Sequence, residues 1–191
     1  MHKSLVNADN LGTIHGLSSC GSDWDHDLTG NIRQMFFDTI NTKNVNDLVQ
    51  ISTFTLGNEN EEVEEFFNAI HELLDDERKV VLIVNDNEDE KHPTCSRFAK
   101  RKMKELKKWR PEKFEYHLFK SNSTHAGKIL HAKLVVVDRT IALVGSANIS
   151  KSALSSNYEI MLKVSGNDVC SRLSLMLENL AEMLEKESDE T

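Results

Sequence analysis

The chain has 191 residues, 39% hydrophobic and 28% charged, a composition typical of one globular domain with a buried core. Its 31 acidic and 23 basic residues give a net charge of −8, which argues against a protein that coats nucleic acid over its whole surface. Apolar runs too short to cross a bilayer, an N-terminus unlike a secretory signal and three widely spaced cysteines predict a cytoplasmic protein with free thiols.

Strands and helices alternate through most of the chain, whereas residues 1–27 show no sustained periodicity. The predicted elements are a helix from Thr29, a strand at 47–56, a helix at 60–76, a strand at 79–86, a helix capped near Thr94 or Ser96, strands at 113–120, 131–138, 141–145 and 157–165, and a helix at about 168–187. This order predicts an α/β fold with a mixed sheet flanked by helices. We divide the chain into an N-terminal extension packed on the domain (1–45), the main domain (46–187) and a frayed acidic tail (188–191).

The helix that follows Ser96 is strongly basic. Residues 97–113 contain nine basic and two acidic side chains, a local charge of +7. Four of the bases recur at helical spacing on one face: Arg97, Arg101, Lys104 and Lys108. Contact with the phosphates of a nucleic acid is one interpretation, and a merely solvated helix face is the other.

Three other features allow two interpretations each. The last helix carries an apolar stripe, which packs on the sheet or forms a dimer contact: Leu173, Met176, Leu177, Leu180, Met183 and Leu184. Asp23, Asp25, His26 and Asp27 form either a metal site or a capped loop before a helix, and we expect the loop and no metal. His125 either lines the mouth of a cleft or lies in an ordinary loop.

The stretch HAKLVVVDRTIALVGSANIS, residues 131–150, places a histidine and a lysine on one face of a predicted core strand. An unpaired buried lysine is costly, so either this face meets an anion or the stretch is not a core strand. The fixed positions are His131-x-Lys133, then Asp138, then Gly145-Ser146-x-Asn148. This pattern resembles the HKD signature of the phospholipase D superfamily at every fixed position, and the elements from about 47 to 187 are similar to one such domain.

The chemistry explains the residue types of the motif. A neutral imidazole at His131 attacks phosphorus and forms a covalent intermediate, while Lys133 holds a phosphoryl oxygen. Ser146 and Asn148 supply neutral hydrogen-bond donors, and Gly145 lets the backbone approach closely. The resemblance implies a structural, charge-pairing role for Asp138, and it implies that this chemistry needs no metal.

A histidine nucleophile also needs an acceptor that fixes its tautomer. In the family, an acid beyond the GSxN segment orients the histidine, and Glu159 occupies the matching place, together with Asn157 on one strand face. A surface acid is the alternative interpretation of Glu159. The serine-rich loop at 150–157 is expected to border the site.

The His-x-Lys pattern occurs once, although catalysis in this family uses two histidines. A two-fold homodimer that brings two copies of His131 across one cleft is the economical solution. Single-motif members are largely nucleases of this kind, which implies a metal-independent nuclease acting on DNA or RNA. The resemblance also implies a place in a restriction or defence system beside an ATPase or helicase partner. The alternatives are a hydrolase of phospholipids or small phosphodiesters, and a non-catalytic nucleic-acid-binding or assembly subunit.

Overall fold

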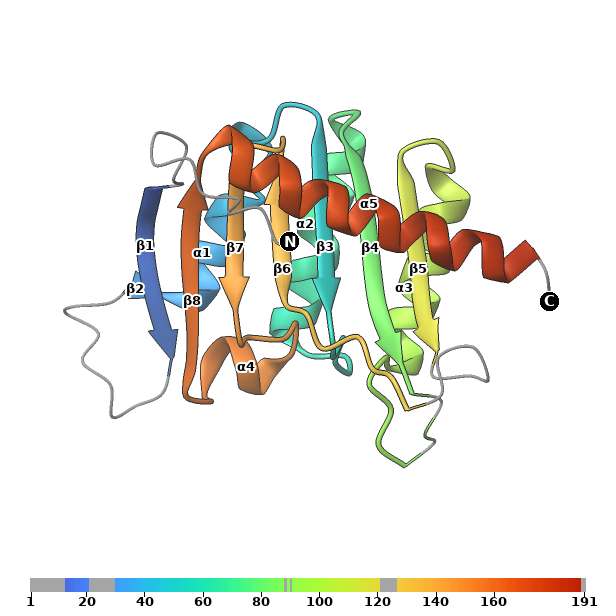
Figure 1. The fold of residues 1–191 in the computed structure, drawn as a ribbon. Helices are drawn as coiled ribbons and strands as arrows, with labels where there is room; N and C mark the ends of the chain where they lie inside the picture. Colours follow the sequence, from blue (N-terminus) through green and yellow to red (C-terminus); the bar gives the residue numbers. More distant parts are fainter. Residues whose placement is uncertain (1–12, 21–29, 88, 90, 121–126, 190–191) are drawn as a thin grey trace, which may run out of the picture.

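The computed structural model describes residues 13–20, 30–87, 89, 91–120 and 127–189, and Figure 1 shows their fold. Within these residues, eight strands form one mixed sheet in the order β2-β1-β8-β7-β6-β3-β4-β5. The strands are β1 (Thr13–Cys20), β2 (Gly30–Asn31), β3 (Leu48–Thr53), β4 (Lys79–Asp86), β5 (Phe114–Lys120), β6 (Leu134–Val137), β7 (Ile141–Gly145) and β8 (Glu159–Ser165). β3, β4 and β5 are parallel, whereas β6, β7, β8 and β1 add to β3 as an antiparallel series.

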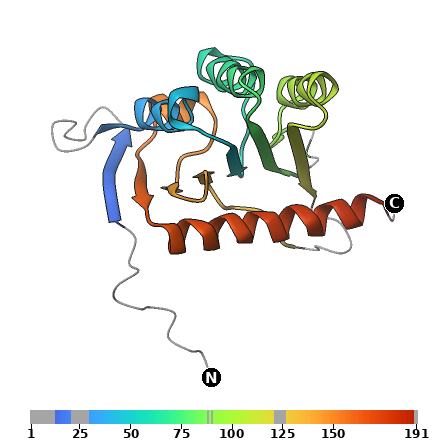
Figure 2. The same ribbon diagram turned by 90° about the horizontal axis from the view of Figure 1, so that it is seen from above.

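Helices cover both faces of the sheet. They are α1 (Ile32–Thr39), the short 3-10 helix η2 (Thr42–Asn44), α2 (Glu61–Asp75), α3 (Arg97–Trp109), α4 (Lys151–Ser155) and α5 (Asn167–Asp189). Figure 2 shows α1 to α4 on one face and α5 lying across the other. The predicted α/β class, a mixed sheet flanked by helices, is therefore confirmed.

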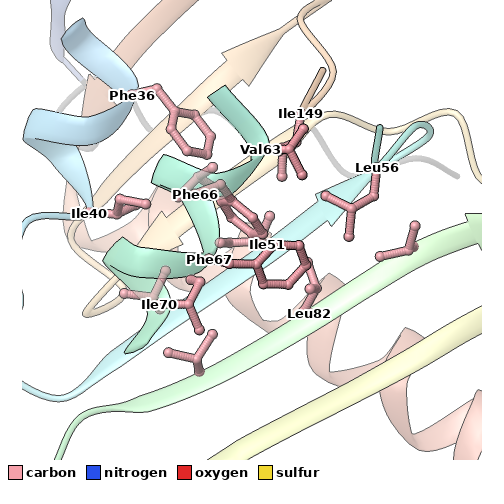
Figure 3. Packing of buried hydrophobic residues seen from close by; sticks show 14 of the residues in the cluster. Phe36, Ile40, Ile51, Leu56, Val63, Phe66, Phe67, Ile70, Leu82 and Ile149 are labelled. Atoms are coloured by element: carbon pink, nitrogen blue, oxygen red, sulfur yellow. The ribbon is translucent and has the colours of Figure 1, made fainter. Parts of the chain in front are cut away.

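The larger core lies between the sheet and the four-helix face. α2 begins at the cap residue Asn60, whose side-chain oxygen accepts a hydrogen bond from the Val63 N–H at 3.1 Å. Its apolar positions then recur every three or four residues and are buried: Val63, Phe66, Phe67, Ile70, Leu73 and Leu74. They pack among side chains of β3, β4 and α1, as Figure 3 shows. Full burial of each such side chain contributes about 2 kcal/mol to folding.

The smaller core lies beneath α5. Leu177 and Leu184 of α5 are buried together with Ile83 and Val136 of the sheet. The predicted apolar stripe thus packs on the sheet at these positions. Met176, by contrast, is 64% exposed.

The four predicted helices and most strands begin and end within a few residues of their predicted bounds, whereas α4 forms where a loop was predicted and η2 was not predicted. The strand predicted at 131–138 is shorter. β6 begins only at Leu134, which pairs with Ser52 of β3 and with Val144 of β7. Before it, the N–H of Leu130 donates to the side chain of Asn85 on β4 at 3.0 Å, which draws the chain away from the β3 ladder. His131 and Lys133 therefore lie in the segment that enters β6, not in the strand.

Residues 13–20 form a strand that the sequence pattern did not predict, whereas α1 follows the helix predicted from Thr29. β1 pairs with β8 over its whole length, with an irregularity between Ile14 and Gly16. α1 contributes the buried side chains of Ile32, Phe36 and Ile40 to the larger core. The domain boundary at residue 45 remains a prediction. Among the described helices, none has the length and hydrophobicity that a bilayer crossing requires.

Candidate active site

Five of the motif residues and Glu159 gather at one end of the sheet, the lower end in Figure 1. β3 and β7 finish there, while β6 and β8 start there. The residues placed at this end are His131, Lys133, Gly145, Ser146, Asn148 and Glu159. Strand ends that meet in this way present side chains from distant parts of the chain to one surface.

Lys133 is buried, with a relative exposure of 7%, and its ammonium contacts a backbone carbonyl and an aromatic ring. Its Nζ donates to the carbonyl of His131 at 2.8 Å and lies 5.2 Å from the centre of the Phe54 ring. Burial lowers the pKa of Lys133 below the usual value of lysine, and the charge of Glu159 acts in the opposite direction. The site therefore holds a cation that is poorly solvated and that an anion would stabilise.

His131 is exposed, and its ring lies 4.9 Å from the ring of Phe54 at an angle of 57°. Neither ring nitrogen forms a hydrogen bond with another residue of the described chain. Phe54 thus contacts both His131 and Lys133. Phe54 was not predicted as a site residue, because it fell inside the strand predicted at 47–56. In the structure β3 ends at Thr53, so Phe54 is the first residue after the strand.

Glu159 bonds to polar neighbours rather than to His131. The Ser146 hydroxyl donates to one carboxylate oxygen, and the Asn157 amide donates to the other at 3.2 Å. The backbone N–H of Ile160 in turn donates to the Ser146 hydroxyl at 3.2 Å. In this single chain, the role predicted for Glu159 in orienting His131 is not formed and remains a prediction.

Asn148 is fixed in one orientation. Its side-chain oxygen accepts a hydrogen bond from the N–H of Thr55 at 3.0 Å, and the Thr53 hydroxyl lies 3.4 Å from the same oxygen. Because the oxygen is used in this way, the amide nitrogen is left as the outward donor. That nitrogen donates to no other residue that the structure describes.

Gly145 lies where two strands approach closely. A Cβ built on it would come within 2.2 Å of the Ile160 carbonyl oxygen and 2.8 Å of the Met161 Cα. The next residue, Ser146, donates its N–H to that same carbonyl at 3.0 Å. A side chain at position 145 would therefore push β7 and β8 apart at the edge of the site.

Asp138 lies at the opposite end of β6, in the turn that leads to β7. Its φ is +49°, a backbone conformation that Asp and Asn adopt more readily than most residues. Its carboxylate accepts hydrogen bonds from the backbone N–H groups of Asn46, Asp47 and Leu48 and from the Asn46 side chain, at 2.8–3.1 Å. Burial alone would raise the pKa of Asp138, but these hydrogen bonds outweigh burial and hold it below its usual value.

The predicted basic face of α3 is exposed to solvent. The helix begins after its cap residue Ser96, whose hydroxyl accepts from the Ala99 N–H at 3.0 Å and donates to the Gly57 carbonyl. Ala99, Met103 and Leu106 point to the core, and the opposite face presents Arg97, Arg101, Lys104 and Lys108. The Arg101 Nε lies 3.9 Å from a carboxylate oxygen of Glu105, within the range of an ion pair. Within the described chain, the other three bases form no ion pair.

Two predicted features lie outside the described residues, namely His125 and the group Asp23, Asp25, His26 and Asp27. The part of the chain that the structure describes contains no group of three or more His, Cys, Asp or Glu side chains placed to hold a metal ion. The serine-rich loop predicted at 150–157 contains α4, and it borders Asn148.

A family model described as "Cardiolipin synthase, PLD-like domain" matches residues 39–181 of this chain. No curated protein matches it. Solved structures with a similar fold include NucT from Helicobacter pylori, with a TM-score of 0.61 and 21% identity over 78% of this chain and 86% of that chain. Nuc from Salmonella typhimurium, a phospholipase D family member, has a TM-score of 0.64 and 11% identity over 88% and 93%. Phosphatidylserine synthase from Haemophilus influenzae has a TM-score of 0.59 and 16% identity, and the match covers 94% of this chain but 40% of the synthase.

Proposed function

Because this chain belongs to the phospholipase D superfamily, we propose that its phosphodiesterase site is that of a metal-independent nuclease acting on DNA or RNA. The observation that carries the proposal is the exposed imidazole of His131 beside the buried, poorly solvated ammonium of Lys133 and the outward amide of Asn148. A nucleophile, a cation and a neutral donor are the groups that phosphodiester cleavage requires.

The reaction proceeds in two displacements. A ring nitrogen of His131 attacks phosphorus, a P–N bond forms, and the bond to the leaving alcohol breaks. A second histidine donates its proton to the departing oxygen. That histidine then removes a proton from water, the water oxygen attacks phosphorus, and the P–N bond breaks to restore His131. Lys133 and Asn148 stabilise the phosphoryl oxygens in both steps.

The second histidine comes from another copy of the chain in this proposal. The sequence holds one His-x-Lys pair, and His131 is open to solvent in the single chain. A two-fold axis beside the site would bring His131 of a second copy opposite the first. Glu159 then supplies the acceptor that orients one of the two imidazoles.

The extent of the structural matches and the surface charge favour nucleic acid over lipid. Matches with NucT and Nuc span 86% and 93% of those chains, whereas the match with phosphatidylserine synthase spans 40% of that chain. The exposed basic face of α3 adds a cationic surface to an otherwise acidic protein. Cleavage of phospholipids or small phosphodiesters is the second candidate, because the matching family description names cardiolipin synthase. A place in a restriction or defence system with an ATPase or helicase belongs to the proposal by family analogy alone.

Cleavage of labelled DNA, labelled RNA and cardiolipin vesicles, measured with wild type and His131→Ala in excess EDTA, tests this function. We expect wild type to cleave nucleic acid in chelator and His131→Ala to lose about 10³-fold or more of that activity. Vesicle cleavage without nucleic acid cleavage would favour the lipid candidate. Absence of cleavage by wild type would favour a non-catalytic subunit, and equal cleavage by wild type and His131→Ala would contradict the role of His131. Activity that EDTA abolishes and Mg²⁺ restores would contradict the metal-independent chemistry.

A further inference from the structure

A groove of about 480 Å³ opens directly beside Asn148. Its walls come from the segment after β3, the segment before α3, and α4 with its flanking residues. The lining residues are Thr55, Gly57, Asn58, Asn60, Pro93, Ser96, Asn148, Ser150, Lys151, Ser152, Ala153, Ser156 and Asn157. Because Asn148 belongs to both, the groove continues from the place where the scissile phosphate would lie.

The described residues that line this groove include no Asp or Glu, although the chain has 31 acids against 23 bases. Other depressions of similar size are acidic. One beside α1 and α2 is lined by Glu61, Glu64, Glu65 and Glu72 with Arg33. One beneath α5 is lined by Asp47, Glu115, Glu178, Glu182 and Glu185 with Lys79 and Arg139. A polyanion would therefore meet less repulsion in the groove beside Asn148 than in these two.

The groove also offers donors that the fold does not use. Lys151 is exposed and forms no ion pair within the described chain, although its charge acts on the carboxylate of Glu62. The side-chain amide of Asn58 makes no hydrogen bond to another described residue. The hydroxyls of Ser96 and Ser150, by contrast, already accept from the first turns of α3 and α4. Lys151, Asn58 and the amide nitrogen of Asn148 are thus left for a ligand.

The lining contains no Phe, Tyr, Trp or His, so bases would have no ring to stack on. Hydroxyls, amides and one ammonium suit the sugar and phosphate groups of a strand, which carry no sequence information. The groove also leads toward α3, because the lining residue Ser96 caps that helix and Arg97 begins its exposed basic face.

We propose that this groove binds the sugar–phosphate backbone of the nucleotides on one side of the scissile bond, with Lys151 contacting a phosphate next to it. The inference rests on the proposed nuclease function and deepens it by placing the flanking strand. Recognition in this groove is insensitive to base sequence, and its strength depends on salt.

Two charge changes test the groove. Lys151→Glu reverses the cation, and Asn58→Asp introduces an anion with almost no change in shape. Lys43→Glu is the matched control, because Lys43 is exposed in η2, before the start of β3, whereas the groove follows the end of β3. The measurements are kcat/KM for an oligonucleotide and for bis(p-nitrophenyl) phosphate, and oligonucleotide binding by fluorescence anisotropy over a range of salt concentrations.

We expect Lys151→Glu to lower the ratio of kcat/KM for the oligonucleotide to that for the small diester roughly tenfold, and to reduce the salt slope of binding by about one. Asn58→Asp changes the ratio in the same direction. If neither variant differs from Lys43→Glu in the ratio or in binding, the groove proposal is wrong while the nuclease function stands. Wild type that binds the oligonucleotide through Lys151 but leaves it intact would instead contradict the proposed function. Unchanged thermal unfolding shows that the variants are folded.

Discussion

Asp138 and His131 belong to one short motif, yet the structure places them at opposite ends of β6. The carboxylate of Asp138 accepts hydrogen bonds from the N–H groups of Asp47 and Leu48 at the start of β3. These bonds help to fix the register in which Leu134 pairs with Ser52. That register determines where the chain leaves the sheet before Leu134, and so where His131 emerges. Asp138 can therefore serve the site through the fold without touching the reacting atoms.

Asp138→Asn should destabilise the protein by about 2 kcal/mol at pH 7, measured by urea unfolding. Asn also tolerates positive φ, so the turn is preserved, but its NH₂ group would face N–H donors and cannot accept from them. Asp38→Asn on the exposed face of α1 is the control and should change stability by less than about 0.5 kcal/mol.

The same pair of variants gives a pH dependence with a definite sign. Because the folded-state pKa of Asp138 lies below its usual value, its carboxylate stabilises the fold above the unfolded pKa of about 3.9. This stabilisation is lost as the pH falls through the folded pKa. The difference between wild type and Asp138→Asn should therefore be full at pH 7 and shrink below about pH 4. A difference that grows on acidification would contradict the assigned hydrogen bonds.

Residue types and their spacing were sufficient to select the residues at the candidate site, because the motif fixes them in sequence. Their mutual contacts were not predictable in the same way. Phe54, which contacts both His131 and Lys133, is 77 positions away from His131 along the chain and belongs to no pattern. The bonding of Glu159 to Ser146 also depends on how β7 and β8 align, which is a property of the sheet.

At the level of elements, helices were predicted more accurately than strand ends. α2 and α3 have both a capping side chain and regular apolar spacing. Both signals are local in sequence, so they can be recognised without knowing the tertiary contacts. The start of β6 depends instead on a long-range hydrogen bond from Leu130 to Asn85. β1 was not predicted because its sequence, TIHGLSSC, has a glycine, two serines and no clear alternation, and its pairing with β8 is long-range.

Gly145→Ala should destabilise the protein by about 3 kcal/mol, because the new Cβ would overlap the backbone of β8. Backbone atoms cannot rotate away as a side chain can, so the strands must separate. Gly57→Ala is the matched control, since its Cβ would lie 3.3 Å or more from its neighbours. Thermal or urea unfolding of both variants makes the comparison. A loss at Gly145 no greater than that at Gly57 would show that β7 and β8 can adjust.

At the scale of the whole molecule, the exposure of the site bears on the proposed dimer. The motif histidine is exposed rather than enclosed in the single chain. Enzymes usually exclude water from the reacting atoms, and in the proposed dimer a second copy over His131 would both enclose the site and supply the second histidine. The sequence does not indicate which surface of the chain would contact that copy.

Mixed dimers test whether two chains build one centre. Wild type is unfolded and refolded with an equal amount of His131→Ala, so that the chains pair at random. If each shared centre needs both histidines, only wild-type pairs are active, and these are roughly a quarter of all dimers. Activity per dimer should therefore fall to about one quarter of the wild-type value, whereas independent sites within each chain would leave about one half. Refolded wild type alone is the control for recovery. A measured half, or a fully active monomer in sedimentation analysis, would refute the composite site and place the second proton donor within the chain, with His125 as the first candidate.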